Sequence, residues 1–239
     1  MASRIKAVLF LLYALVRRDA RPKVVFYHDV GTEWTPMGTP RRIFWAHMKC
    51  LRKGDVVCLD DGFRGVWEDR ERLKAMGIRP RLSVAPRLVG TTGYLNWDEL
   101  RTLHRDYGFA IMCHGWSHQT LVGPMIDESP LEDRTEEWYN RELVESRAKI
   151  AAEINDAVDE LCFPVGQFSE KLIERCRKAG YRKVYASYPG NAGDGYVQPR
   201  CLVQDLGVVG FWAVLRGGMN VLTGRYYKRQ LMGGDDEAE

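Results

Sequence analysis

Residues 56–65, VVCLDDGFRG, contain an apolar run that ends in two adjacent aspartates and a glycine. The apolar residues predict a strand buried in the core of the protein. Placing Asp60 and Asp61 side by side where that strand ends is costly, because like charges a few ångströms apart resist ionising together. A turn would use one aspartate as a cap, whereas a pair indicates a bound cation or a shared proton.

The overall composition excludes several classes of protein. The chain has 239 residues, of which 45% are hydrophobic and 28% charged, as is ordinary for a soluble globular protein. Its 35 Lys and Arg residues nearly balance 32 Asp and Glu, which argues against a nucleic-acid partner. None of the six cysteines form a Cys-x-x-Cys pair, so we expect all six to be reduced in a cytoplasmic protein.

Strand-like and helix-like segments alternate along most of the chain. Apolar runs predict strands at 23–30, 55–62, 80–86, 109–115, 160–166 and 182–187. Helical apolar spacing predicts helices at 41–53, 64–77, 96–108, 136–158 and 169–180. Asn96 is the predicted N-cap of the third helix, and Gly108 its stop. This alternation indicates an α/β fold with a buried parallel sheet and a site at the carboxyl ends of its strands.

The stretch CHGWSHQTL, residues 113–121, places two histidines four residues apart at the end of a predicted strand. On one helical turn, His114 and His118 would point in the same direction. Two histidines, one carboxylate and an open position for water are a normal catalytic zinc arrangement. Asp61 is the candidate carboxylate ligand, which leaves Asp60 to take a proton from water. The alternative is a capped turn whose two imidazoles are hydrogen-bonded to other protein groups.

These motifs resemble those of the polysaccharide deacetylases, the NodB-like carbohydrate esterases of family 4. Residues 60–62 match the Asp-Asp-Gly that ends the family's first motif, and residues 114–118 match its His-x-x-x-His. Three longer stretches resemble the family as well: YHDV at 27–30, NWDELRTLHRDYGFAIMCHGWSH at 96–118 and FPVGQFSEKLIERCRKAGYRKVYAS at 163–187. The resemblance covers most of the chain between residues 23 and 187.

The resemblance implies a distorted, incomplete (β/α) barrel in a single domain. It also implies a metal-dependent reaction that removes N-acetyl, sometimes O-acetyl, groups from sugars. In that chemistry Asp61, His114 and His118 hold one divalent metal ion, expected to be zinc, and Asp60 is the general base. Backbone N–H groups just after the aspartate pair would stabilise the oxyanion.

Three features depart from the family pattern. The third motif usually carries an arginine two residues before its proline, where it orients the catalytic aspartate, and Cys162 stands there in this chain. Val165 replaces a common tyrosine. The usual C-terminal histidine, the general acid, is absent, because no histidine follows His118. Either Asp60 serves as both base and acid, or His28 at the end of the first strand donates the proton.

We expect three segments: an N-terminal amphipathic helix at 1–22, a deacetylase-like barrel at 23–205, and a C-terminal helical extension with an acidic tail at 206–239. The apolar centre of residues 4–18 is about ten residues long, whereas a bilayer span needs about 20. This segment is a packed helix, an interfacial membrane helix or a removed signal. Residues 206–232 predict an interfacial surface, with tyrosines and basic residues at 225–229, or a helix that closes the barrel. The charged run 132–147 predicts a solvated helix face.

Sequence and resemblance together predict a cytoplasmic metal-dependent deacetylase of bacterial surface polysaccharide assembly, such as that of O-antigen, capsule or lipopolysaccharide. Its substrate would be an N-acetylated sugar or glycan, free or lipid-linked, with the protein soluble or peripheral at the inner membrane face. One alternative is a secreted chitin or peptidoglycan deacetylase. The other is an inactive barrel that only binds glycans, which the missing arginine and histidine favour and the intact Asp-Asp and His-x-x-x-His disfavour.

Overall fold

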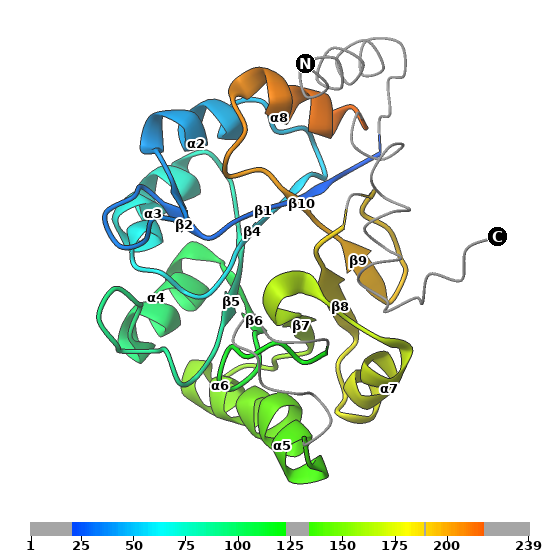
Figure 1. Ribbon diagram of the computed structural model, residues 1–239. Coiled ribbons are helices and arrows are strands. Elements are labelled where there is room, and N and C mark those ends of the chain that lie inside the picture. Colours follow the sequence, from blue (N-terminus) through cyan, green and yellow to red (C-terminus); the bar gives the residue numbers. More distant parts are fainter. Residues whose placement is uncertain (1–20, 123–133, 189, 218–239) are drawn as a thin grey trace, which may run out of the picture.

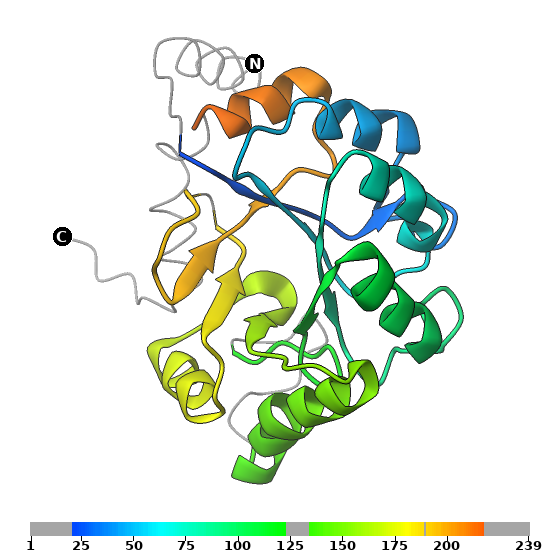
Figure 2. The ribbon, with the colours of Figure 1, turned by 180° about the vertical axis from the view of Figure 1, so that it is seen from behind.

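The computed structural model describes residues 21–122, 134–188 and 190–217. In these parts of the chain, eight strands form one parallel sheet in the order β10-β1-β4-β5-β6-β7-β8-β9. The sheet curls into a nearly closed barrel with helices on its outer side (Figure 1 and Figure 2). The strands are β1 (Val24–Tyr27), β4 (Val56–Leu59), β5 (Arg81–Val84), β6 (Ala110–Cys113), β7 (Glu160–Cys162), β8 (Lys183–Ala186), β9 (Val197–Pro199) and β10 (Cys201–Leu202). The predicted α/β fold with a distorted barrel is confirmed.

Helices pack on the outside of the barrel, and all but the last of them connect one barrel strand to the next (Figure 1). They are α2 (Arg41–Met48), α3 (Gly65–Ala75), α4 (Trp97–Tyr107), α5 (Glu136–Asn140), α6 (Ser146–Ile154), α7 (Glu170–Lys178) and α8 (Val208–Leu215). Four shorter elements are a π-helical turn, a 3-10 turn and a separate two-stranded sheet: η2 (Arg141–Glu145), η3 (Pro164–Gly166), β2 (Asp29–Val30) and β3 (Gly38–Thr39). α5, η2 and α6 follow one another without a break and form the long helix predicted over 136–158.

Helix α4 has the ends that its sequence predicts. The Asn96 side chain accepts a hydrogen bond from the backbone N–H of Glu99, whose carboxylate accepts one from the Asn96 N–H in return. This reciprocal capping box satisfies backbone donors that the first helical turn leaves free. Gly108 ends the helix in the left-handed region, at φ 70°, which glycine adopts without steric cost. Both predicted ends of this helix are confirmed.

The barrel is closed by a segment for which no strand was predicted. β9 pairs with β8 at one edge of the sheet, and β10 pairs with β1 at the other. Arg200 lies between them, and its N–H donates to the carbonyl of Ala186 across 2.9 Å. One stretch of chain therefore joins both edges. Its two strands are short and Pro199 interrupts the apolar run, so the sequence lacks a clear strand pattern there.

Side chains of the strands alternate between the two faces of the barrel wall. Val25 and Tyr27 of β1 face the helices, whereas Val24 and Phe26 face the barrel interior. The inner cluster consists of Val24, Phe26, Cys58, Met112, Cys162 and Tyr185. The alternation continues past the strand ends, so the next inward positions hold polar side chains: His28, Asp60, His114 and Ser187. The period of two thus places the site residues directly above the inner core.

The predicted barrel segment, 23–205, contains every strand of the described chain. α8 begins just after it and packs on α2, where the Phe211 ring stacks on the His47 imidazole at 4.2 Å. Residues 1–20 and 218–239 lie outside the described residues, so the predicted terminal helix, the 225–229 cluster and the acidic tail stay predictions. Among the described helices, none has the length and apolar character required to cross a membrane.

Candidate metal centre and active site

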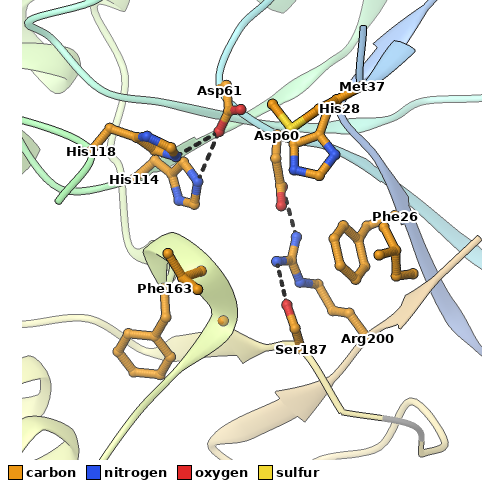
Figure 3. Close-up of a pocket in the computed structure, with 13 residues that line it drawn as sticks. Phe26, His28, Met37, Asp60, Asp61, His114, His118, Phe163, Ser187 and Arg200 are labelled. Atoms are coloured by element: carbon orange, nitrogen blue, oxygen red, sulfur yellow. Dashed lines mark hydrogen bonds and ion pairs between the residues drawn. The ribbon is translucent and has the colours of Figure 1, made fainter. Parts of the chain in front are cut away.

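A cavity of about 480 Å³ opens at the carboxyl ends of the barrel strands (Figure 3). It gathers the polar residues singled out in the sequence from the ends of three strands, β1, β4 and β6: His28, Asp60, Asp61, His114 and His118. Apolar and small side chains complete the wall: Phe26, Met37, Phe163, Val165, Gly166 and Leu202. Ser187 and Arg200 also line it. The structure therefore brings together all five residues that the sequence predicts for the site.

Asp61, His114 and His118 converge on one point in this cavity (Figure 3). The Oδ1 atom of Asp61 lies 2.8 Å from Nε2 of His118 and 3.2 Å from Nε2 of His114. Although Asp61 is buried, this oxygen makes no hydrogen bond of normal geometry with either ring. Three ligand atoms within 4.8 Å of one another, one of them a buried oxygen without a hydrogen bond, fit a divalent cation at their centre.

The tautomer of His114 also suits metal binding. Its Nδ1 lies 2.7 Å from the backbone carbonyl of Cys162, so Nδ1–H donates to that oxygen. The Nε2 lone pair is then left pointing at Asp61 and His118. An outer hydrogen bond of this kind fixes the ring of a metal-binding histidine and makes its other nitrogen a better ligand.

The histidine pair does not lie on a helical turn, and that prediction is wrong. Residues 114–118 form an irregular loop after β6, in which His118 has a positive φ of 63°. The buried carboxylate of Glu142 accepts hydrogen bonds from the backbone N–H groups of Trp116 and Ser117, at 2.7 and 3.1 Å. The two imidazoles still meet, with ring centroids 4.8 Å apart. Hydrogen bonds to Glu142 therefore fix the conformation of this loop. They take the place of the backbone hydrogen bonds that would fix a helical turn.

The structure also differs from the sequence prediction at Glu142. The run 132–147 was predicted to be a solvated helix face, yet this glutamate is only 2% exposed. It lies in the π-helical turn η2. Its carboxylate points to residues 114–118, the candidate metal-binding loop, rather than to solvent. Helical charge patterning could not reveal this, because a carboxylate that binds loop N–H groups looks like any other charge in a sequence.

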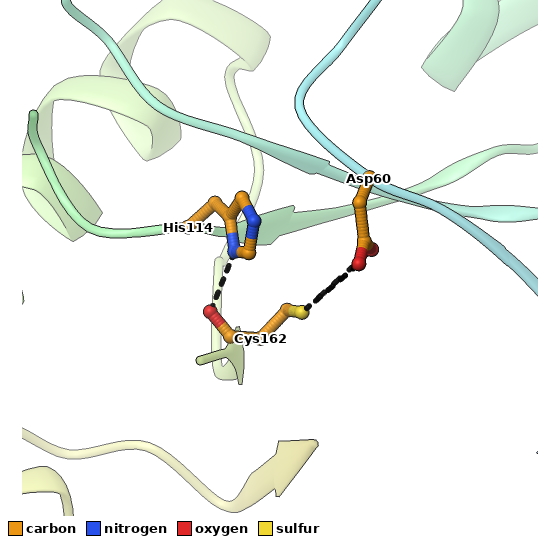
Figure 4. Close-up of side chains that lie close together, drawn as sticks. All are labelled: Asp60, His114 and Cys162. Atoms are coloured by element: carbon orange, nitrogen blue, oxygen red, sulfur yellow. Dashed lines mark hydrogen bonds between the residues drawn. The ribbon is translucent and has the colours of Figure 1, made fainter. Parts of the chain in front are cut away.

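Asp60 is held by three side chains on the barrel interior. Its Oδ1 accepts hydrogen bonds from Arg200 Nη1 at 2.7 Å and from Ser83 Oγ at 2.9 Å, and the Cys162 thiol lies 3.7 Å away (Figure 4). Burial alone would raise the pKa of this carboxyl, but the positive charge of Arg200, with a smaller contribution from the nearby His114 ring, holds the pKa below its usual value. Asp60 is therefore ionised at neutral pH, as a general base must be.

Asp60, His114 and Cys162 form a second group with metal-ligating atoms (Figure 4). Burial raises the pKa of the Cys162 thiol well above its usual value, so the sulfur stays protonated. Only the thiolate binds metal well, and Asp60 is already engaged by Arg200. The group of Asp61, His114 and His118 is thus the better metal site.

Arg200 is the functional residue that sequence reasoning missed. It is 1% exposed, and its guanidinium lies 4.2 Å from the centre of the Phe26 ring as well as against Asp60. The arginine expected at position 162 is thus replaced by one that comes 38 residues later, from the closing segment. A hint was present: an arginine within the apolar stretch VQPRCLV needs a buried partner, because an unpaired buried charge is very costly.

The sequence model of the family named "Polysaccharide deacetylase" matches residues 59–184, which is more than half of the chain. The chain belongs to the polysaccharide deacetylase family. YxkH of Bacillus subtilis strain 168, whose name places it among the polysaccharide deacetylases, is 20% identical over 200 residues, 73% of this chain and 67% of that protein.

Two solved structures show the same fold as this polysaccharide deacetylase. IcaB from Ammonifex degensii superposes with a TM-score of 0.70 at 17% identity, covering 82% of this chain and 98% of that one. A de-N-acetylase from Aggregatibacter actinomycetemcomitans gives 0.67 at 16% identity, covering 80% and 99%. At these identities the similarity establishes the barrel fold and leaves the substrate open.

Backbone strain in the deacetylase concentrates at this cavity. Four non-glycine residues of the described chain have a positive φ, and three of them line the cavity: Asp61 at 70°, His118 at 63° and Val165 at 59°. A β-branched residue in the left-handed region is especially unfavourable, and such strain clusters at functional sites. Val165 is also 51% exposed at the cavity wall, in place of the tyrosine common in the family.

His28 lies in the cavity beside Asp60, as predicted from its place at the end of β1 (Figure 3). Its Nδ1 is 2.5 Å from Oε1 of Gln204, which follows the closing segment and holds the imidazole in place. The ring is therefore positioned within the same cavity as the candidate base. Its role as general acid stays a prediction.

We expect His114→Ala and His118→Ala proteins to lose bound zinc, because each change leaves two of three protein ligands. Metal analysis after dialysis measures this directly. A ligand that binds only the folded state stabilises it, so the melting temperature of the parent should also rise with zinc, and that of the variants should not. His104→Ala on α4 is the control. Parent-like zinc content in folded variants would contradict the site.

Proposed function

We propose that this deacetylase is a metal-dependent hydrolase that removes N-acetyl groups from a sugar during bacterial surface polysaccharide biosynthesis. One observation carries the proposal: Asp61, His114 and His118 converge at 2.8 and 3.2 Å directly beside the ion-paired Asp60. A cluster of potential ligands next to an ionised, buried carboxylate provides both parts of an amide hydrolysis. Family membership supports an acetylated glycan as the substrate.

Each residue of the site would have its own role in the hydrolysis. Zinc held by Asp61, His114 and His118 would polarise the acetyl carbonyl as a Lewis acid. Asp60 takes a proton from the attacking water, and Arg200 keeps its carboxylate ionised and directed into the cavity. Backbone N–H groups after Asp61 would stabilise the oxyanion. Zinc is proposed over other metals because imidazole and carboxylate ligands suit it.

The rival hypothesis of an inactive glycan-binding barrel loses one of its two supports. It rested on the missing C-terminal histidine and on the absence of an arginine near the catalytic aspartate, since Cys162 occupies the family position. Arg200, which lies between β9 and β10, contacts Asp60 at 2.7 Å and provides the missing positive charge. A barrel that only binds glycans has no need of a buried, ion-paired carboxylate next to a metal-binding cluster.

For the cellular setting, we propose the cytoplasmic side of the inner membrane, with a free or lipid-linked N-acetylated sugar as substrate. The amphipathic sequences at both ends of the chain support this proposal, because such segments bind membrane surfaces. Sedimentation of the full chain with anionic vesicles at low and high salt tests it, since each basic residue near the surface adds about 1 kcal/mol of salt-sensitive attraction. Absence of binding at low salt would favour a soluble substrate.

Acetate release from N-acetylated oligosaccharides tests the proposed activity. We expect the zinc-loaded protein to release acetate, chelation to abolish the release and added zinc to restore it. Activity that survives complete removal of the metal would contradict metal dependence. No acetate release from N-acetylated substrates, with O-acetylated ones cleaved, would replace the amidase proposal with an esterase.

His28→Ala separates the two hypotheses for the general acid. If His28 protonates the leaving amine, the variant should keep its metal and lose turnover, and the alkaline limb of its pH–rate profile should shift or vanish. Gln204→Ala is a milder comparison, because it removes only the group that holds the ring. An unchanged alkaline limb with a raised KM would instead assign both proton transfers to Asp60.

A further inference from the structure

A second cavity, of about 410 Å³, lies on the other side of the metal-binding loop. It is lined mainly by aromatic rings, cations and neutral polar groups: Arg87, Trp116, Ser117, Gln119, Trp138 and Arg141. These residues come from the loops after β5 and β6 and from the start of the α5–η2 helix. The cavity is therefore on the same rim of the barrel as the catalytic one, and no step of the deacetylation described above uses it.

The two cavities share one loop as their common wall. His114 and His118 line the catalytic cavity, whereas Trp116 and Ser117, which lie between them in the sequence, line the second. The backbone N–H of Arg87 donates to the Trp116 carbonyl at 3.1 Å, which ties the β5 loop to this wall. A single glycan chain lying across the loop could therefore reach both cavities.

The second cavity contains two arginines, Arg87 and Arg141, against one acidic residue, Glu142. Arg87 and Arg141 make no ion pair with any acidic residue in the described ranges. The acid in the cavity wall, Glu142, is buried and already accepts the N–H groups of Trp116 and Ser117. By contrast, Arg175 on α7 is paired with Glu136.

The aromatic rings offer flat apolar surface next to these cations. The guanidinium of Arg141 lies 5.1 Å from the centre of the Trp116 ring. Trp138, from α5, also lines the cavity, and the guanidinium of Arg134 lies 4.1 Å from the centre of its ring. Indole rings have an apolar face and can pack against the C–H face of a sugar, and a guanidinium fork matches a carboxylate in two parallel hydrogen bonds.

The backbone at this cavity is irregular where Arg141 and Glu142 occur. Both lie in the π-helical turn η2, which interrupts the α-helical hydrogen bonding between α5 and α6. π-helical turns within α-helices are rare and often mark functional sites. Here the turn allows neighbouring residues to serve two purposes: Glu142 faces the metal-binding loop, and Arg141 lines the second cavity.

We propose that the second cavity is a subsite for a carboxylate-bearing sugar, a uronic acid, in the same glycan whose N-acetyl group occupies the catalytic cavity. Trp116 and Trp138 pack against the sugar ring, and Arg87 and Arg141 bind its carboxylate. The proposal rests on the proposed function for the identity of the neighbouring sugar. It names the substrate class: an anionic polysaccharide that alternates, or mixes, N-acetylated and uronic acid residues.

Binding to the zinc-loaded Asp60→Asn protein tests this subsite without turnover. The two probes are a hyaluronan tetrasaccharide, which contains N-acetylglucosamine and glucuronate, and chitotetraose, which is neutral, each measured by titration calorimetry. We expect the hyaluronan probe to bind more tightly, and its advantage to shrink as salt is raised. Adding Arg87→Gln and Arg141→Gln together should reduce that advantage by about tenfold or more, the usual scale for lost charge-assisted hydrogen bonds.

Arg42→Gln is the matched control, because Arg42 is an exposed arginine on α2, outside both cavities. Zinc remains in every variant, so its own attraction for a carboxylate cancels in the comparison. Trp116→Ala should weaken binding of both probes. Equal affinities of the two probes, an advantage that survives in the double arginine variant, or no binding of either probe would each overturn the proposal.

Acetate release by the parent enzyme separates this proposal from the proposed function. Release from chitotetraose together with no preference for the anionic probe would reject the uronate subsite and keep the deacetylase. An arginine-dependent preference without any acetate release would keep the subsite and reject the enzyme. The two proposals therefore fail on different measurements.

Discussion

Asp60→Asn is expected to lower kcat/KM for deacetylation by about 10²-fold or more, the usual loss when a general base is removed. An amide of nearly the same shape can still accept hydrogen bonds from Arg200 and Ser83, but it cannot accept a proton from water. The zinc content should remain that of the parent, because Asp61, His114 and His118 are untouched. Steady-state kinetics and metal analysis on one preparation measure both quantities.

The same variant should also be less stable. Arg200 is buried, and without Asp60 it would keep its charge with no counter-ion, which is strongly unfavourable. Circular dichroism must therefore show a folded protein at the assay temperature before the kinetic loss is interpreted. Asp98→Asn, on the exposed surface of α4, is the control. Near-parent activity in a folded, zinc-loaded Asp60→Asn protein would show that the base is a different residue.

Arg200→Ala is expected to be damaging in two ways, because Arg200 both balances and orients Asp60. Removing one partner of a buried ion pair typically costs about 3–5 kcal/mol of stability. Both side chains are almost fully buried and 2.7 Å apart, so this range applies with little screening. Turnover should fall as well, by about 10²-fold, since the base would lose the group that fixes its position and charge. Urea unfolding and steady-state kinetics measure the two losses.

The loss of stability in Arg200→Ala should depend on pH. In the parent, Arg200 and His114 hold the pKa of Asp60 below its usual value despite burial. Asp60 therefore contributes stability above the pKa that it has in the unfolded chain, and this contribution is lost as the pH falls through the lower folded pKa. Without the guanidinium, burial should raise the pKa. The destabilisation by Arg200→Ala should accordingly be smaller in acid and larger near neutral pH.

The acidic limb of the pH–rate profile should move in the same direction. Only the ionised carboxylate can act as the base, so a raised pKa of Asp60 shifts that limb to higher pH in Arg200→Ala. Loss of packing alone would lower stability without moving the limb. An unchanged limb and a parent-like kcat would therefore mean that Arg200 serves only to fill the barrel.

A companion experiment places an arginine at position 162, where the family usually has one. Cys162 lies against Asp60 from β7, with its sulfur 3.7 Å from Oδ1, and it lies where the family usually has an arginine. In the Cys162→Arg, Arg200→Ala double variant, the space vacated by Arg200 can receive the new guanidinium. We expect the double variant to recover part of the turnover and the acidic limb. Cys162→Ser with Arg200→Ala is the control that should not recover.

Much of this site is determined by local sequence patterns. An apolar run that ends at Asp60 and Asp61 predicts a strand with paired carboxylates at its end, because burial and alternation depend on neighbouring residues alone. The ends of α4 follow from Asn96 and Gly108 for the same reason, since a cap acts within one helical turn. These features would be predicted correctly even if the rest of the fold were unknown.

The tertiary structure decided what the sequence pattern left open. The spacing of His114 and His118 suggested a helical turn, but the carboxylate of Glu142 reaches from a distant helix and holds the segment as a loop. Similarly, Arg200 meets Asp60 across 140 positions of sequence, only because the closing segment joins both edges of the sheet. The arginine expected two residues before Pro164 is thus provided by the segment that closes the barrel.

The sequence by itself determined the α/β alternation, the Asp-Asp and His-x-x-x-His groups and the strand ends that carry them, whereas the barrel was implied by the family resemblance. These features depend on periodicity and on spacing within a few residues, and both can be read from the sequence. Only the tertiary structure decided which cation balances the buried base and how the histidine loop is held. A buried ion pair requires that two distant residues meet in a water-free interior, and that meeting is set by the closure of the barrel rather than by either residue's neighbours in the chain.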